Sequence, residues 1–161
     1  MVVFVLAVAV CLTACGEQQE LDTTGSETGA TMTRDEVIAA GDAVCAQSRR
    51  KAKPLVDRLI SSSDPRERAG LLRQVATVAE PAIQRLATVR PPSDRRQALD
   101  DYVLLGNEQI AIIRRAADRL DEGDQANAGA LLVSVLDKGA KLRSLAQGYG
   151  FKVCGTELDG S

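Results

Sequence analysis

The side chains with the most distinctive chemistry in this chain are its four cysteines, Cys11, Cys15, Cys45 and Cys154. A thiolate can act as a nucleophile, bind a metal or form a disulfide, and its surroundings decide which. The chain contains no His, which excludes Cys–His and Ser–His catalysis and removes the commonest metal ligand. The position of each cysteine within the pattern of the chain is therefore the first guide to its role.

Cys15 follows an apolar run, residues 1–14, that contains no charged residue. As a helix this run would span roughly 21 Å, too short for a hydrocarbon core of roughly 30 Å. Its length is typical of the apolar centre of a signal peptide. Leu12, two small residues and Cys15 resemble the bacterial lipobox. The resemblance implies that residues 1–14 are a lipoprotein signal peptide, cleaved before Cys15, and that the Cys15 thiol carries a diacylglyceryl group.

Two acyl chains anchor a protein stably at a membrane without crossing it. The predicted location is the extracytoplasmic face of the plasma membrane, with the membrane itself as one partner through the lipid anchor. Residues 15–32 are predicted to be the lipidated cysteine and a flexible polar tether. The seventeen residues after Cys15 would span roughly 20–25 Å on average.

If Cys11 is removed and Cys15 is lipidated, Cys45 and Cys154 form the single possible intramolecular pair. Exported proteins meet an oxidising environment in which paired cysteines persist, and this pair lacks the C-x-x-C spacing of redox motifs. In an antiparallel bundle Cys45 lies roughly 18 Å from the end where the last helix finishes. The extended segment before Cys154 covers about 15 Å, so the two cysteines can meet. We therefore predict a structural disulfide.

Residues 33–155 show helical periodicity throughout, which predicts an all-α fold. Thr33 with Glu36 and Asp64 with Glu67 are expected to form capping boxes, Ser93 opens a third helix, and Asp124 caps a fourth that ends near Gly148 or Gly150. Short connections make neighbours antiparallel. The prediction is an antiparallel up-down four-helix bundle, with one disulfide tying the C-terminal tail to the first helix and a disordered tail at 156–161.

Two prolines, Pro54 and Pro81, fall inside the first two predicted helices and are expected to kink them. Such kinks could open a pocket, whose predicted lining is Leu55, Leu59, Val78 and Ile83. The alternative is that both prolines only curve the helices around the core. A basic cluster, residues 49–53, could contact anionic lipid head groups, or could simply be a solvated helix face.

The composition excludes several other roles. The net charge of −2 implies no strongly charged partner, and after residue 14 the only aromatic residues are Tyr102, Tyr149 and Phe151. A stacking platform for single-stranded nucleic acid needs more aromatic side chains than these, so no nucleic acid is expected. Most carboxylates stand at helix starts, where capping explains them. We predict no metal, no cofactor and no enzymatic activity.

The sequences around the paired cysteines, "DAVCA" at 42–46 and "YGFKVCG" at 149–155, resemble signatures of small helical lipoproteins and secreted proteins from high-GC Gram-positive bacteria. Fifteen Arg against five Lys, with abundant Ala, suit such a genome. The resemblance implies a helical fold and a cell-envelope location, and it brings no assigned activity. Our first hypothesis is a non-enzymatic interaction or structural module with an envelope protein partner. The alternative is a lipoprotein that binds a small molecule or lipid between its helices.

Overall fold

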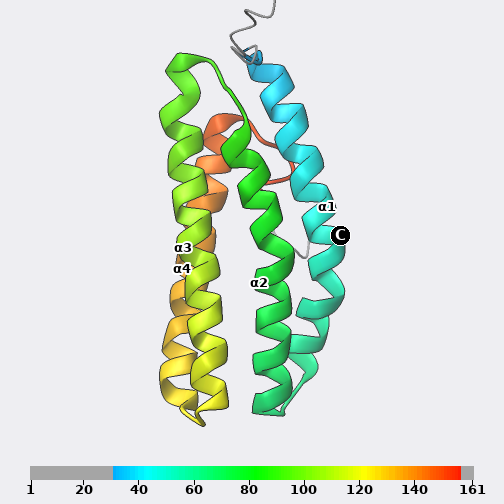
Figure 1. Cartoon of the computed structure of the whole chain (residues 1–161), viewed down its shortest axis with the longest axis vertical. Helices are drawn as coiled ribbons and strands as arrows, with labels where there is room; N and C mark the ends of the chain where they lie inside the picture. The colour runs from blue at the N-terminus through cyan, green and yellow to red at the C-terminus, as the bar shows by residue number, and fades with distance from the viewer. Residues whose placement is uncertain (1–30, 157–161) are drawn as a thin grey trace, which may run out of the picture.

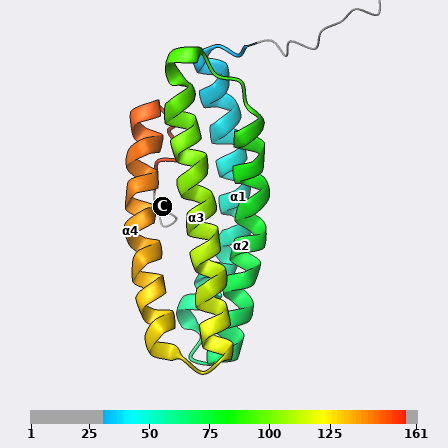
Figure 2. The same ribbon diagram turned by 60° about the vertical axis from the view of Figure 1, so that its left-hand side comes forward.

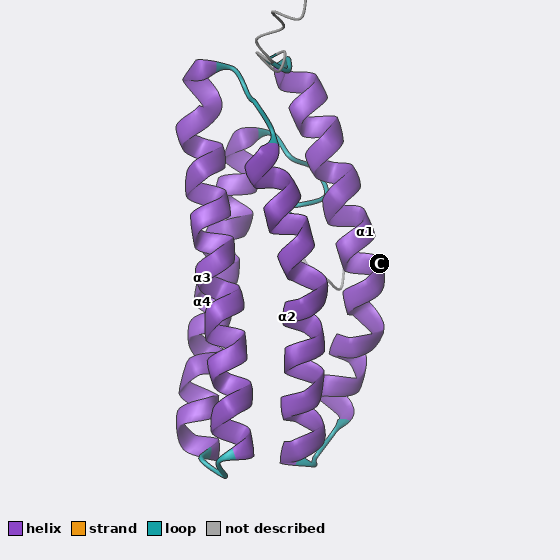
Figure 3. Cartoon of the chain, viewed as in Figure 1, coloured by secondary structure: helices purple, strands orange, loops and turns teal. Residues whose placement is uncertain are grey.

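The computed structural model describes residues 31–156, which form four long helices and one turn of 3-10 helix. Their bounds are α1 Arg34–Ser61, α2 Pro65–Thr88, η1 Ser93–Arg95, α3 Arg96–Asp121 and α4 Gln125–Tyr149 (Figure 1). No strand occurs within these residues, as Figure 3 shows. Consecutive helices run up and down through short connections. The predicted antiparallel four-helix bundle is confirmed.

Several predicted segments lie outside the described residues. They are the signal peptide (1–14), Cys15, most of the tether (15–32) and most of the tail (156–161). The described part of the chain contains no helix that is both long enough and apolar enough to cross a membrane.

The first helix begins as its sequence predicts. The Thr33 hydroxyl accepts from the Glu36 N–H at 3.3 Å, and the Glu36 carboxylate accepts from the Thr33 N–H at 2.7 Å. These two bonds satisfy two N–H groups that a helix start leaves without intrahelical partners. The Thr33 N–H and the Thr33 hydroxyl both donate to the Glu36 carboxylate, which stabilises its ionised form and lowers the pKa of Glu36.

The start of α2 differs in part from the prediction. Asp64 accepts from the Arg66 N–H at 3.0 Å and so caps the helix as expected. The Glu67 carboxylate, however, accepts from the Ser62 hydroxyl at 2.7 Å and from the Arg58 guanidinium at 2.8 Å. The short connection brings the end of α1 within reach, and a charge-assisted bond to Arg58 is stronger than a neutral one to the backbone. Glu67 therefore joins the two helices.

The last helix ends in a left-handed residue, Gly150, with φ 110°. Its N–H donates to Gln147 O at 3.0 Å, and the Phe151 N–H donates to Ala146 O at 2.9 Å. This pair of bonds is the Schellman motif, which favours glycine because a Cβ is strained at positive φ. The motif turns the chain sharply out of α4 and back toward α1.

Neither proline ends its helix. Both α1 and α2 continue past Pro54 and Pro81, although α1 is visibly bowed in Figure 1. Both proline side chains are exposed, so the backbone carbonyl that loses its N–H partner is on the solvent side, where water can replace it. The outcome is curvature without a break.

The core lies between helices that follow one another in the chain. The close packing is of α1 on α2, α2 on α3 and α3 on α4, whereas α1 and α4 are much less closely packed. On that side of the bundle the chain after α4 crosses back to α1 (Figure 2). The largest fully buried side chains are Tyr149, Leu71, Leu86, Leu99, Val37 and Pro91.

Candidate functional site

Residues 150–156, which we call the docked segment, lie against α1 and are held there covalently. Cys45 on α1 and Cys154 form a disulfide with a Cα–Cα distance of 5.2 Å. The predicted pairing is confirmed, and it closes a loop across 109 residues of sequence. Cys45 is 9% exposed, and Cys154 is half-buried.

Asp42 organises the backbone of the docked segment. Its carboxylate accepts from the N–H groups of Lys152 at 3.0 Å, Val153 at 2.7 Å and Cys154 at 3.3 Å. Consecutive N–H groups turned toward one carboxylate make a small anion-binding concavity that this chain fills itself. Sequence reasoning did not assign this role to Asp42, although the residue opens the "DAVCA" stretch three positions before Cys45.

Gly41 makes room for the docked segment. A Cβ at this position would lie 2.3 Å from Phe151 Cε1, closer than any real contact. The Phe151 ring, 3% exposed, stacks on Tyr149 with ring centroids 4.7 Å apart and lies 6.1 Å from Tyr102. The structure thus gathers into one cluster all three aromatic residues that follow the predicted signal peptide. Tyr102 lies far from Tyr149 and Phe151 in sequence, and no local pattern indicated that the three rings lie together.

Two further groups adjoin the docked segment. The Arg49 guanidinium donates to Val153 O at 3.1 Å and to the Thr156 hydroxyl. Burial raises the pKa of the Tyr102 phenol to about 12, and the negative charge of Asp42 adds to the rise. Tyr102 therefore stays neutral over the physiological range.

A cavity of about 220 Å³ lies in the bundle beneath the disulfide. We call it the central cavity. Its wall comes from all four helices and the docked segment, and includes Cys45, Ile83, Tyr102, Leu142 and Cys154. The volume is below the 300–1,000 Å³ that is usual for ligand pockets, but it exceeds a cavity that holds benzene, about 150 Å³.

The four residues predicted to line a pocket are not brought together around one cavity. Ile83 lines the central cavity, while Val78 lines a separate groove of about 160 Å³ beside Pro81. Leu55 and Leu59 are half-buried and are not among the lining residues of these pockets. Pro54 borders an open groove of about 790 Å³ on the outside of α1, together with Arg49, Arg50 and Lys53.

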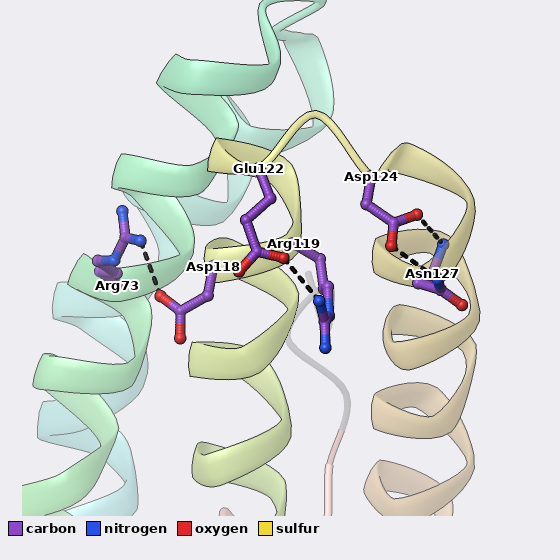
Figure 4. A network of polar contacts seen from close by, with 6 residues as sticks. All are labelled: Arg73, Asp118, Arg119, Glu122, Asp124 and Asn127. Atoms are coloured by element: carbon purple, nitrogen blue, oxygen red, sulfur yellow. Dashed lines mark hydrogen bonds and ion pairs between the residues drawn. The ribbon is translucent and has the colours of Figure 1, made fainter.

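The far end of the bundle carries a network of ion pairs around the α3–α4 turn (Figure 4). Arg73 pairs with Asp118 at 2.8 Å, Arg119 pairs with Glu122 at 2.6 Å, and Asp124 accepts from the Asn127 amide at 2.6 Å. These bonds raise the pKa of Arg73 and lower that of Asp124, so each group is held in its charged form. The network stabilises the turn between α3 and α4.

Among residues 31–156, no group of three or more Cys, Asp or Glu side chains is arranged to hold a metal ion. The features that remain as candidate sites are the central cavity with its docked segment and the exposed surface of the bundle.

Fold and site together define a single antiparallel four-helix bundle whose C-terminal segment is fastened to its first helix by a disulfide. Comparison with known proteins finds no match to a protein-family model, a curated protein or a solved structure.

Proposed function

We propose that this chain is a non-enzymatic lipoprotein, anchored through Cys15 at the extracytoplasmic face of the plasma membrane, that acts as an interaction module at the cell envelope. The anchor rests on the lipobox resemblance of residues 12–15. The disulfide between Cys45 and Cys154 fits an exported protein, since such bonds persist in oxidising compartments.

The interaction role rests on one observation, the apolar outer face of α4. This face consists mainly of exposed small or apolar residues, Ala126, Gly129, Ala130, Val133, Leu136 and Ala140, with one exposed charged residue, Asp137, among them. Val133 is 60% exposed and Leu136 is 72% exposed. A contiguous apolar surface on a folded protein is typical of a site that another molecule covers.

The neighbouring helix provides the contrast. The exposed side of α3 carries mainly charged and polar residues, including Asp100, Asp101, Asn107 and Arg114, and has one exposed large apolar side chain, Leu104, at 60%. Such a face is well solvated and needs no partner. We therefore propose that the outer face of α4, and not the exposed side of α3, contacts an envelope protein.

The membrane anchor is tested by an intact-mass measurement on protein extracted from host membranes, before and after reduction. We expect a diacylglyceryl mass on a chain that begins at Cys15, and a gain of about 2 Da on reduction of its one disulfide. An unlipidated chain recovered from the medium would contradict the proposal.

The interaction role is tested by a photo-crosslinking amino acid placed at Leu136 in the intact host, with Asn107 on α3 as the matched exposed control. We expect a discrete adduct from position 136 that Val133→Lys abolishes, and none from position 107. Equal labelling at both positions would contradict a specific role for α4.

The central cavity supports a second candidate, the binding of a small molecule between the helices. The cavity has a volume of about 220 Å³, and its lining includes the buried apolar side chains of Ile83, Leu86 and Leu142. This is the observation that favours the second candidate. The two candidates use different parts of the molecule and do not exclude each other.

A further inference from the structure

We propose that the outer face of α4 pairs with the same face of a second copy of this chain, with the two α4 helices antiparallel and the two-fold axis beside Val133. This inference rests on the proposed interaction role of that face, and it names the partner. It is independent of the central cavity.

One side of α4 is left uncovered by the rest of the bundle. Among the described helices only α3 packs closely against α4, and Figure 2 shows α4 at the edge of the bundle. From Gln125 to Leu136, nearly half of the helix, no residue carries a charge. The exposed side chains of this half therefore lose little solvation when an apolar surface covers them.

The large and small residues of the face lie on opposite sides of Val133, which is itself 60% exposed. Leu136 comes three positions after Val133, and Gly129 comes four positions before it. An antiparallel pair that crosses at Val133 exchanges the two halves of the face, so each Leu136 meets the partner's Gly129. A Cβ at Gly129 would have nothing within 4 Å in the single chain, so this position is open to a side chain from outside. A surface that supplies both members of a contact is what a two-fold interface requires.

The charged groups at the two ends of the face favour the antiparallel direction. Lys141 lies eight positions after Val133, and Asp124, the N-cap of α4, lies nine positions before it. The hydrogen bonds from Asn127 lower the pKa of Asp124, so its carboxylate is ionised at neutral pH. Antiparallel pairing brings each Lys141 near the partner's Asp124, whereas parallel pairing would bring like charges together at both ends.

Asp137 argues against a membrane surface as the occupant of this face. Its side chain is exposed among the apolar residues. A surface of anionic lipids would repel the carboxylate. In the antiparallel pair Asp137 lies beside the partner's Ala130, a small residue at the edge of the contact.

The length of the face determines how strong the pairing is. From Ala126 to Ala140 the helix rises about 21 Å. A contact between two helices over this length belongs to the small class of specific interfaces, which bury less than about 1,200 Å² in total. We therefore expect a weak dimer that forms mainly where the anchors hold copies of the chain on one membrane and raise their effective concentration.

The test uses the intact host, in which two copies of the full chain with different epitope tags are made together. A photo-crosslinking amino acid replaces Ala140, with Asn107 on α3 as the matched exposed control. We expect an adduct from position 140 that carries both tags, and none from position 107. The attachment should map to the tryptic peptide 120–138 of the second copy, because antiparallel pairing places Ala140 beside the partner's Ala126. Attachment within 139–143 of the second copy would show parallel pairing and would overturn the inference.

A pair of substitutions at exposed positions tests the contact itself. Gly129→Leu should lower the yield of the two-tag adduct about tenfold, because its side chain takes the place of the partner's Leu136. Leu136→Ala should lower the yield as well. The double variant Gly129→Leu, Leu136→Ala exchanges the large and the small residue and should restore the yield to within about twofold of the parent chain. Leucine and alanine both favour helices, so the fold is kept. Ala111→Leu on the exposed side of α3 is the control and should leave the yield unchanged.

The outcomes separate this inference from the role it rests on. An adduct that joins position 140 to a different protein, with no two-tag adduct, would overturn the second copy as partner and keep the interaction role of the face. No protein adduct from position 140, or an adduct with lipid alone, would overturn both. A double variant whose yield stays as low as that of Gly129→Leu would also overturn the inference, because the exchange then fails to restore the contact.

Discussion

The docked segment buries its large apolar side chain, whereas the outer face of α4 leaves its large apolar side chains exposed to solvent. In the docked segment Phe151 is 3% exposed, since Gly41 makes room for its ring and Asp42 pairs with the backbone that follows. On α4, Leu136 remains 72% exposed in a regular, uninterrupted helix. Burial in this protein therefore depends on whether a neighbouring element is shaped to receive the side chain. Apolar content alone does not decide it.

The largest effect should come from removing the bond that holds the docked segment. The double variant Cys45→Ala, Cys154→Ala opens a loop with a sequence separation of 109 residues. In the chain-entropy model this lowers the free energy of unfolding by about 4–5 kcal/mol. Denaturant unfolding followed by circular dichroism measures the loss. A change below about 1 kcal/mol would mean that noncovalent contacts alone fix the segment.

Alkaline pH should weaken the same region. Tyr102 has a pKa of about 12 in the folded chain against 10.0 for the unperturbed group. The unfolded chain loses the Tyr102 proton at a lower pH than the folded chain does. The contribution of Tyr102 to the free energy of unfolding is therefore complete below pH 10 and is lost as the pH rises toward 12. The difference corresponds to about 3 kcal/mol. The measurement is unfolding free energy against pH, and Tyr102→Phe should remove this part of the slope. If Tyr102→Phe left the slope of the unfolding free energy against pH unchanged, the loss of stability at alkaline pH would come from another group.

A pair of glycine substitutions compares the two regions directly. Gly41→Ala places a methyl group 2.3 Å from Phe151 and should destabilise the chain by about 1–3 kcal/mol. Gly129→Ala on the outer face of α4 meets nothing within 4 Å and should stabilise it by about 0.5–1 kcal/mol, because alanine favours the helix. Thermal and denaturant unfolding of both variants gives the signs. If both substitutions changed the free energy of unfolding in the same direction, the docked segment and the outer face of α4 would not differ in the way described.

The smallest effect on stability is expected at Leu136, the most exposed large apolar side chain of α4. Leu136→Lys should change the unfolding free energy by no more than about 0.5 kcal/mol, since the side chain has little to lose in the isolated protein. The same variant should abolish any association that depends on the α4 outer face, measured by crosslinking from a probe at Val133. A large loss of stability would show that Leu136 already belongs to the core.

The candidate site was predictable only in part. Counting cysteines predicted the Cys45–Cys154 bond, because one pair remains if Cys11 and Cys15 belong to a lipoprotein signal and its lipidation site, as we propose. Of the residues predicted for a pocket, Ile83 alone lines the central cavity, since the prediction placed the opening at the prolines. The cavity instead lies where four helices and the docked segment converge, a position that no local pattern encodes.

The sequence by itself determined the helices, most of their caps and turns, and the disulfide. These features depend on residues three or four apart, or on a pairing with no competitor, and both can be read along the chain. Only the tertiary structure decided that Asp42 holds the docked segment, that Gly41 receives Phe151, and that the outer face of α4 stays uncovered. Those outcomes depend on distances between residues more than a hundred positions apart, or on which surface finds no neighbour. Such distances are set by the packing of whole helices.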